Sequence, residues 1–287
     1  MSQSAMSKAG FGSSTPVTTA FEFTNFTGGS VKPHLSANGL RGTRSHIAER
    51  TIEGPEEVQY GFETFPNPEE CAAMLPIAGF AATGTTFNLT EALTAYAFTF
   101  DKVAKVPSYS ASKCNSLTVM ATKGSPWKWS WDMIGAQETD GDAGTFPSLS
   151  LTESQPFALH HGVFTIGGSA RSVVEFSMKI DHLIEAQTNN NTYADLIEET
   201  DRIVTVELTL PYTAANTDLK NQAVAGAAGS AVFTNGNYSC TFTFGRLQFP
   251  RGAVEIQGKS GIMLRLSGQA RMTGSTRELV IVLDSTP

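Results

Sequence analysis

The chain has few charged residues and few cysteines for its length. Only 16% of its 287 residues are charged, and three are cysteine. Cys71, Cys114 and Cys240 are odd in number and far apart, so they predict free, buried thiols and argue against a disulfide framework or a zinc cluster. Lys and Arg number 20 against 27 Asp and Glu, a net charge of −7. This balance argues against tight binding of nucleic acid, which a basic surface would provide.

Long hydrophobic runs are also missing. No apolar run approaches the roughly 20 residues that a transmembrane helix needs, so no membrane partner is expected. Residues 1–19 are small and polar and contain no apolar stretch of the kind found in a signal peptide. We therefore expect a flexible N-terminal arm over residues 1–19.

The chain is rich in short stretches in which apolar and polar residues alternate. This alternation predicts β-strands with one buried face, and the 26 glycines suit the turns between such strands. Two long loops are expected at residues 28–50 and 184–200. The clearest alternating stretches are Val58 to Phe62, Trp127 to Trp131, Val174 to Ile180 and Val204 to Leu210.

One order of landmarks occurs twice. Thr64-Phe65-Pro66 precedes a predicted helix at 67–75, which Asn67 caps and Pro76 ends. Thr209-Leu210-Pro211 precedes a second predicted helix near 216–221. Further landmarks are Phe98-Thr99-Phe100 with Pro107, and Phe242-Thr243-Phe244 with Pro250.

Offsets of 145, 144 and 143 residues between these landmarks predict a tandem duplication. The strand alternation matches better at 146, so we expect a one-residue bulge near Pro211. The predicted organisation is an arm (1–19), a first β domain (20–138), a linker (139–156) and a second β domain (157–287).

The sequence contains no strong catalytic or metal-binding pattern. His160 and His161 are predicted on a strand, where neighbouring side chains point to opposite faces and cannot share a metal. Asp140-Gly141-Asp142 lacks the later glutamate of a calcium loop. We expect no enzyme activity, no cofactor and no metal. The three tryptophans favour core or interface packing over a sugar-binding platform.

The C-terminal half resembles the major tail tube proteins of long-tailed, siphophage-type bacteriophages. The resemblance rests on Asp201–Tyr212, on Gln222–Gly229 with the following Phe233–Ser239, and on Ser177–Asp181. In the N-terminal half, Ala97–Lys102 followed by Lys113–Leu117 resembles the two-domain version of that family.

The resemblance implies an all-β fold with short flanking helices. Two tandem β-sandwich domains would contribute strands to an intersubunit β-barrel, and rings would stack into a tube. The implied partners are further copies of the chain, the tape-measure, tail terminator and tail-tip proteins, and DNA in transient, non-specific passage. The implied location is the phage tail in the virion, after assembly in the host cytoplasm.

On this reading, the polar faces of the strands at 174–180 and 204–210 line the channel. An acidic or neutral wall would let DNA slide, whereas a basic wall would hold it. A trimeric ring with pseudo-sixfold symmetry is favoured, with a hexameric ring as the alternative. A tail-tip or decoration protein, or a glycan-binding β-sandwich module, is the alternative function. The candidate channel-lining residues are Glu175, Lys179, Asp181 and Glu207.

Overall fold

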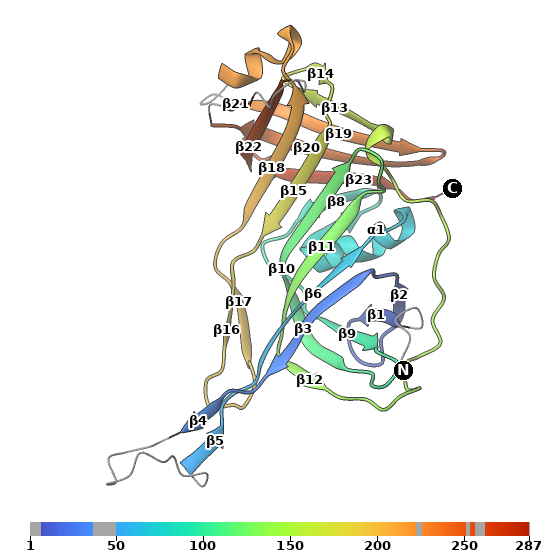
Figure 1. Cartoon of the computed structure of the whole chain (residues 1–287), viewed down its shortest axis with the longest axis vertical. Helices are drawn as coiled ribbons and strands as arrows, with labels where there is room; N and C mark the ends of the chain where they lie inside the picture. The colour runs from blue at the N-terminus through green and yellow to red at the C-terminus, as the bar shows by residue number, and fades with distance from the viewer. Residues whose placement is uncertain (1–6, 37–49, 222–225, 251–252, 256–261, 287) are drawn as a thin grey trace.

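The computed structural model describes residues 7–36, 50–221, 226–250, 253–255 and 262–286 (Figure 1). Strands dominate it, and the described residues contain one α-helix, α1 (Pro68–Met74). The expected all-β class is therefore confirmed. No helix in this part of the chain has the length and apolar character needed to cross a membrane.

The strands follow one another through both halves of the chain. The first half contains β1 (Lys8–Gly12), β2 (Thr19–Phe21), β3 (Asn25–Val31), β4 (His34–Ser36), β5 (Thr51–Glu53), β6 (Glu57–Thr64), β7 (Phe80–Thr83), β8 (Thr86–Leu89), β9 (Tyr96–Asp101), β10 (Ser108–Thr122), β11 (Lys128–Gly135) and β12 (Gln137–Thr139). The second half contains β13 (Gly162–Ile166), β14 (Ser169–Arg171), β15 (Glu175–Asp181), β16 (Ile184–Gln187), β17 (Leu196–Glu199), β18 (Ile203–Pro211), β19 (Ala227–Asn235), β20 (Tyr238–Gln248), β21 (Ala253–Glu255), β22 (Met263–Arg271) and β23 (Leu279–Asp284).

A long antiparallel sheet runs through both halves. Its strand order is β3–β6–β11–β10–β15–β18–β22–β21. The two halves meet where β10 pairs with β15, from Ser116↔Asp181 to Thr122↔Glu175. Among the described strands, β3 pairs only with β6 and β21 only with β22, so both ends of this sheet are open edges.

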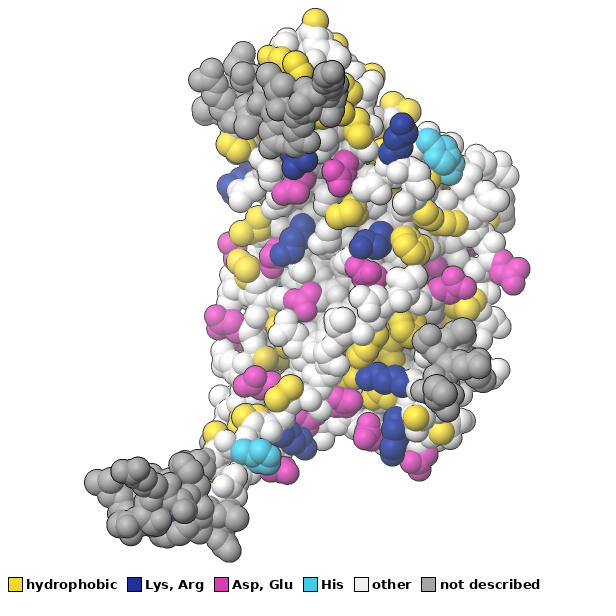
Figure 2. All heavy atoms as spheres, in the orientation of Figure 1, with side chains coloured by type: hydrophobic (Ala, Val, Ile, Leu, Met, Phe, Trp, Pro, Cys, Tyr) yellow, Lys and Arg dark blue, Asp and Glu magenta, His cyan; other side chains and the backbone are white. Residues whose placement is uncertain are grey.

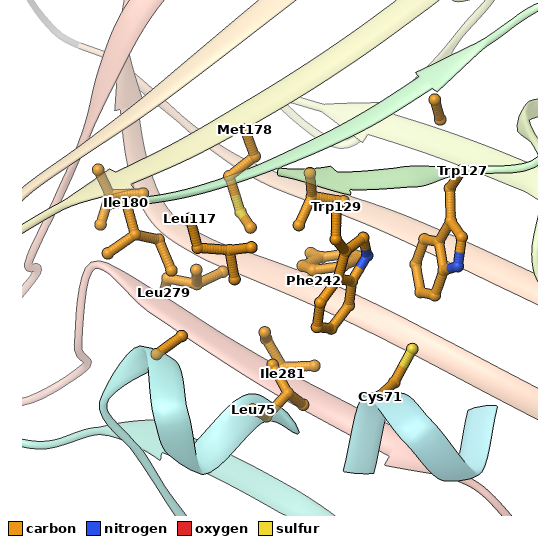
Figure 3. Packing of buried hydrophobic residues seen from close by; sticks show 14 of the residues in the cluster. Cys71, Leu75, Leu117, Trp127, Trp129, Met178, Ile180, Phe242, Leu279 and Ile281 are labelled. Carbon is orange, nitrogen blue, oxygen red and sulfur yellow. The ribbon is translucent and has the colours of Figure 1, made fainter. Parts of the chain in front are cut away.

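Further strands and α1 cover one face of this sheet. The strand order β2–β1–β9–β10 covers the first half, and β14–β13–β19–β20–β23–β8–β7 covers the second. Figure 3 shows Trp129, Met178 and Ile180 packed towards α1, with Phe242 and Ile281 filling the space between. One buried cluster runs through both halves, so the halves share a hydrophobic core.

Part of the predicted N-terminal arm belongs to the fold. Strand β1 pairs with both β2 and β9, and Ala9, Phe11 and Val17 are buried. A flexible arm over all of residues 1–19 is therefore wrong for residues 8–12, because their alternate apolar side chains fill the first-half core. Residues 1–6 lie outside the described residues.

The two predicted long loops contain strands. Residues 28–50 include the end of β3 and all of β4, which pairs with β5; residues 184–200 include the paired strands β16 and β17. Both hairpins extend beyond the lower end of the long sheet (Figure 1). Residues 37–49 of the first segment lie outside the described part.

The first predicted helix is confirmed and the second is of a different type. In α1, the Asn67 side chain accepts from the N–H of Glu70, and the Glu70 carboxylate accepts from the N–H of Asn67. Pro76 does not end the helical region, because a 3-10 helix at Leu75–Ala78 continues it. The second region forms 3-10 helices at Ala214–Asn216 and Asp218–Asn221.

The same order of strand pairings occurs in both halves. The order β3–β6–β11–β10–β9–β1–β2 corresponds to β15–β18–β22–β20–β19–β13–β14, with β21 continuing the course of β20. The landmark match of Phe98 with Phe242 is wrong in these terms, because the counterpart of β9 is β19 rather than β20. The duplication itself stays a prediction.

The strand register also corrects the expected bulge near Pro211. Helix α1 begins at Pro68 and its counterpart at Ala214, an offset of 146 that also matches the buried positions of β6 and β18. Strand β18 pairs with β22 without a shift as far as Pro211↔Met263. The offset of 146 therefore holds through the strand and into the helix, and no bulge is needed.

Residues 140–156 contain no helix or strand and run along one side of the molecule between the halves (Figure 1). They contact the first half, where the Asn67 amide donates to the Thr152 carbonyl oxygen at 3.0 Å. The predicted domain boundaries stay a prediction, since the halves share one sheet and one core.

Candidate functional site

The four candidate channel residues lie on one face of the long sheet. Glu175, Lys179 and Asp181 alternate along β15 with buried Phe176, Met178 and Ile180, and the same alternation places Glu207 on β18. The register pairs Ser177 with Glu207. All four charged side chains therefore project from the face opposite the core.

Neighbouring polar groups hold these side chains along the sheet. Lys179 is the one basic residue among the four candidates. Its Nζ lies 2.5 Å from Asp181 Oδ2, so this carboxylate neutralises its charge. Ser267 Oγ donates to Glu207 Oε1 at 3.1 Å, and Thr209 donates to Glu175 at 3.4 Å. The face therefore presents short hydrogen-bonded groups instead of free cations.

The whole of this face, called the polar wall below, carries mixed charge. Six acidic and five basic side chains of the central strands alternate with buried residues, giving a net charge of −1 (five minus six). These residues are Glu57, Glu63, Asp132, Glu175, Asp181, Glu207, Lys113, Lys128, Lys179, Arg265 and Arg271. Figure 2, which shows one side of the molecule, likewise has acidic and basic side chains interspersed instead of gathered by sign.

The three tryptophans are part of the core. Trp127, Trp129 and Trp131 are at most 3% exposed, and Trp127 Nε1 donates to the Pro66 carbonyl oxygen at 2.9 Å. The packing interpretation is confirmed. A sugar platform on these indoles is wrong, because no ligand can reach their faces.

The histidine pair lies in a 3-10 helix, at Leu159–His161, and not on a strand as predicted. The rings of His160 and His161 contact each other, with centroids 4.1 Å apart. Burial, followed by the neighbouring His160, lowers the pKa of His161. Within the described residues, no group of three His, Cys, Asp or Glu side chains is arranged to hold a metal ion.

All three cysteines are free and buried, as predicted. Burial raises the pKa of each thiol, so the nucleophilic thiolate form is disfavoured. These cysteines fill space in the core and have no environment that would activate them.

Sequence reasoning missed two features of the molecule's edges. Glu138 accepts from the backbone N–H of Ser30, on edge strand β3, at 2.6 Å. Apolar side chains are exposed along both projecting hairpins and the residues that flank them. They are Val31, Leu35, Ile52, Leu183, Tyr193 and Leu196. No local pattern marks either feature, because the first depends on which strand is left unpaired and the second on the two hairpins projecting beyond the sheet.

Residues 7–270 match the family model described as phage tail tube protein. The chain belongs to the phage tail tube protein family. This membership assigns it a structural role in the virion tail, in agreement with the resemblance found in the sequence. A search of curated proteins gave no match.

Proposed function

We propose that this tail tube protein self-assembles into rings that stack into the tube through which phage DNA passes. The observation that carries the proposal is a long sheet with two open edges and a polar face opposite the core. An open edge exposes unpaired backbone groups, and closing strands across neighbouring subunits satisfies them. The tail would be of the siphophage type, and the chain would be the two-domain form.

A ring of three copies has the width that the passage of duplex DNA requires. Strands spaced by ~4.8 Å and tilted by ~40° give a wall about 50 Å across for 24 strands and about 95 Å for 48. Three copies with eight strands each supply the 24, as do six copies that each contribute only the four strands of the second half, whereas six copies with eight strands each supply 48. A duplex about 20 Å across, with its hydration, suits the narrower wall. The repeated pairing order would give this trimer pseudo-sixfold symmetry.

The polar wall would face the channel. Its net charge is slightly negative and Lys179 is paired with Asp181, so the wall offers few free cations to exchange for the counterions of DNA. DNA would therefore pass without being held. In this arrangement Glu175, Lys179, Asp181 and Glu207 line the channel.

The projecting hairpins would join successive rings. Their exposed apolar side chains include Val31 and Ile52, at 63% and 64% exposure. Val163, on β13 at the other end of the molecule, is also exposed, at 59%. Stacking would bury these side chains. The tape-measure, terminator and tail-tip proteins would meet the tube at its interior and its two ends, after assembly in the host cytoplasm.

Charge reversal on the wall tests this function. Glu175→Lys with Glu207→Lys should leave tubes intact by electron microscopy and lower DNA delivery at least tenfold, because added cations bind phosphates. Asp140→Lys with Glu153→Lys, at two exposed positions of the segment between the halves, is the control with the same charge change. Unchanged infectivity of the double variant would contradict the channel assignment.

The competing functions predict other behaviour. A tail-tip or decoration protein would occur in a few copies at one end or on the outside of the tail, as labelling with an antibody would reveal. A glycan-binding module would be retained on a glycan column. Since the three indoles are buried, no observation on this chain favours that module.

A further inference from the structure

The molecule contains, within one chain, a joint that can serve as the template for contact between chains. Strand β10 of the first half pairs with β15 of the second half. By pairing order, β21 is the second-half counterpart of residues 116–122 of β10, called the far part of β10 below, and β3 is the first-half counterpart of β15. These counterparts are the two open edges of the long sheet.

The register of the pairings fixes which residues correspond. Phe62 pairs with Phe26, and its counterpart Leu208 pairs with Phe176, so β3 and β15 differ by 150 residues. The same reasoning through β11 and β22 makes Val254 the counterpart of Val119, an offset of 135.

The two strands even share an irregularity. The pairing of β10 with β11 shifts by one residue between Cys114 and Ser116. The pairing of β22 shifts by one residue in the same sense between its partners β20 and β21. Because the shift falls at corresponding places, the far part of β10 and β21 have corresponding registers against β11 and β22.

We propose that the β21 edge of one copy pairs antiparallel with the β3 edge of the next copy, in the register of the β10–β15 joint. This inference rests on the proposed function and deepens it by naming the contact that closes the ring. Val119 pairs with Met178 in the joint. Val254 therefore lies opposite Gly28 of the neighbour, Ala253 opposite Gly29, and Glu255 opposite Thr27.

The direction of the backbone groups agrees with this register. In the joint, the N–H of His182 donates to Asn115 O at 2.9 Å, so even-numbered residues of β15 direct their N–H groups towards β10. Ser30 is the counterpart of Ile180, and its N–H is likewise taken by a group other than β6, namely the Glu138 carboxylate. By the same alternation, the proposed register directs the N–H of Gly28, a residue with a φ of +90°, outward to a neighbour, and Glu138 marks where the free edge ends.

The partner is a second copy of this chain and not an unrelated strand. The two edges have the relation to each other that β10 and β15 have within the chain, so each copy carries both halves of the contact. Repeating the contact adds eight strands per copy. It also keeps the polar wall on the same side of the sheet, because the β10–β15 joint places the polar residues of both strands on one face.

Cysteine pairs test the register. The pair Thr27–Glu255 has the non-hydrogen-bonded geometry of Ser177–Met120 in the joint, with Cα atoms about 4.5 Å apart, within disulfide reach. Oxidised Thr27→Cys/Glu255→Cys should form disulfides between chains, with covalent multimers ending at the ring's copy number on a non-reducing gel. Met120→Cys/Ser177→Cys, the matched control, should give a disulfide within one chain.

A pair out of register supplies the contrast. Thr27→Cys/Ala253→Cys places the cysteines on a diagonal about 7–8 Å apart, so cross-linking should be at least tenfold slower. If this pair links faster than Thr27→Cys/Glu255→Cys in assembled rings, the register is wrong while the proposed function stands. If the wild-type chain forms no ring or tube by electron microscopy, both fail.

A substitution that alters the backbone of β21 provides a second test of the proposed contact. Val254→Pro removes an N–H that this register directs to the neighbour, while its pairing with β22 uses other residues. The variant should fold with unchanged circular dichroism and lose ring assembly, and Val254→Ala should assemble as wild type. Rings formed by Val254→Pro at the wild-type level would overturn the proposed contact.

Discussion

The two halves of the chain pair their strands in the same order but fill their cores differently. In the first half, rings of Phe11, Phe21, Phe62, Phe98 and Phe100 pack with centroids about 5–6.5 Å apart. The second-half counterpart of Phe21 is Arg171, which pairs with Asp218 at 2.8 Å. What repeats is therefore the backbone pairing and its edges, while the side-chain chemistry that holds each half together differs.

This difference teaches which features the proposed ring requires. A ring needs matching edges and a continuous polar wall, and both depend on register. It does not need the same side chains in each core. Different core side chains in the two halves are therefore compatible with a close match of their pairings.

The largest expected effect tests whether the halves form one cooperative unit. Trp127 is fully buried, and its ring contacts Phe157, Phe233 and Phe242 of the second half. Trp127→Ala should lower the free energy of unfolding by about 4 kcal/mol. Val163→Ala, at an exposed site, should change it by less than about 0.5 kcal/mol.

Urea denaturation checks this prediction with two signals. All three tryptophans lie in the first half, so the fluorescence of Trp129 and Trp131 still reports that half, while circular dichroism reports both halves. The two transitions should coincide in the variant. Separate transitions would show that the halves unfold independently despite their common core.

The next effect compares the two core chemistries at corresponding positions. Phe21→Ala should cost about 3–4 kcal/mol through lost burial. Arg171→Ala should cost about 2–3 kcal/mol, because Asp218 is half exposed and stays partly solvated. Arg171→Met should cost less than about 1 kcal/mol, since an apolar side chain suits the position that Phe21 occupies in the first half.

Acid titration sharpens the same comparison. The Arg171 side chain lowers the pKa of the Asp218 carboxyl below its ordinary value of 3.8. Stability from this pair is therefore present above pH 3.8 and lost as the pH falls through the lowered pKa. Arg171→Met should lack this acid-sensitive component in thermal melts between pH 5 and 2. An unchanged acid profile would contradict the role given to the pair.

A smaller effect concerns the two helix starts. Burial raises the pKa of Glu70 to about 7, while its second-half counterpart, Asn216, cannot ionise. A raised carboxyl pKa gives stability that is present below about pH 4.5 and lost as the pH rises to about 7. Glu70→Gln should remove this loss and be more stable than wild type by about 2 kcal/mol at pH 8.

Thermal melts from pH 4 to 8 measure that difference. Near pH 4 the wild type and Glu70→Gln should have similar melting temperatures, and the gap should widen with rising pH. Glu69→Gln, at the neighbouring position in the first turn, is the control. A constant gap across the range would show that Glu70 does not titrate in the folded chain.

The smallest effect concerns the edge of the first half. Glu138 covers the N–H of Ser30 on β3, whereas the corresponding strand β15 is already paired with β10. Glu138→Ala should cost about 1–2 kcal/mol in stability, because its carboxylate accepts hydrogen bonds from the Ser30 N–H and from the Tyr109 hydroxyl, and both are lost. It should also shorten the lag before tubes form in light scattering. A longer lag would indicate that Glu138 assists pairing.

The positions of the central strands β6, β11, β15 and β18, the all-β class and the first helix could be predicted from local alternation and capping. The side of the sheet that carries Glu175, Lys179, Asp181 and Glu207 also follows from alternation, since period two fixes the face. The landmark match of Phe98 to Phe242 failed, because similar triplets occur on strands that pair differently. The strand β1 was missed because Lys8 to Gly12 is short and rich in small residues.

Other features depend on distant partners and lie beyond local patterns. The joint between β10 and β15 pairs residues about 60 apart, and no residue type marks it. The burial of Trp127 depends on rings of the second half, those of Phe157, Phe233 and Phe242, which pack around it. The open edges and the Glu138 contact could be recognised only after every other strand had found its partner.

An image reconstruction of the isolated tail tube is the most direct test of the central claim, that one chain supplies two corresponding segments of the channel wall. We predict three copies per ring, eight wall strands from each copy, and β21 of one copy beside β3 of the next. Six copies per ring, with only the second half of each chain at the channel, would contradict this account.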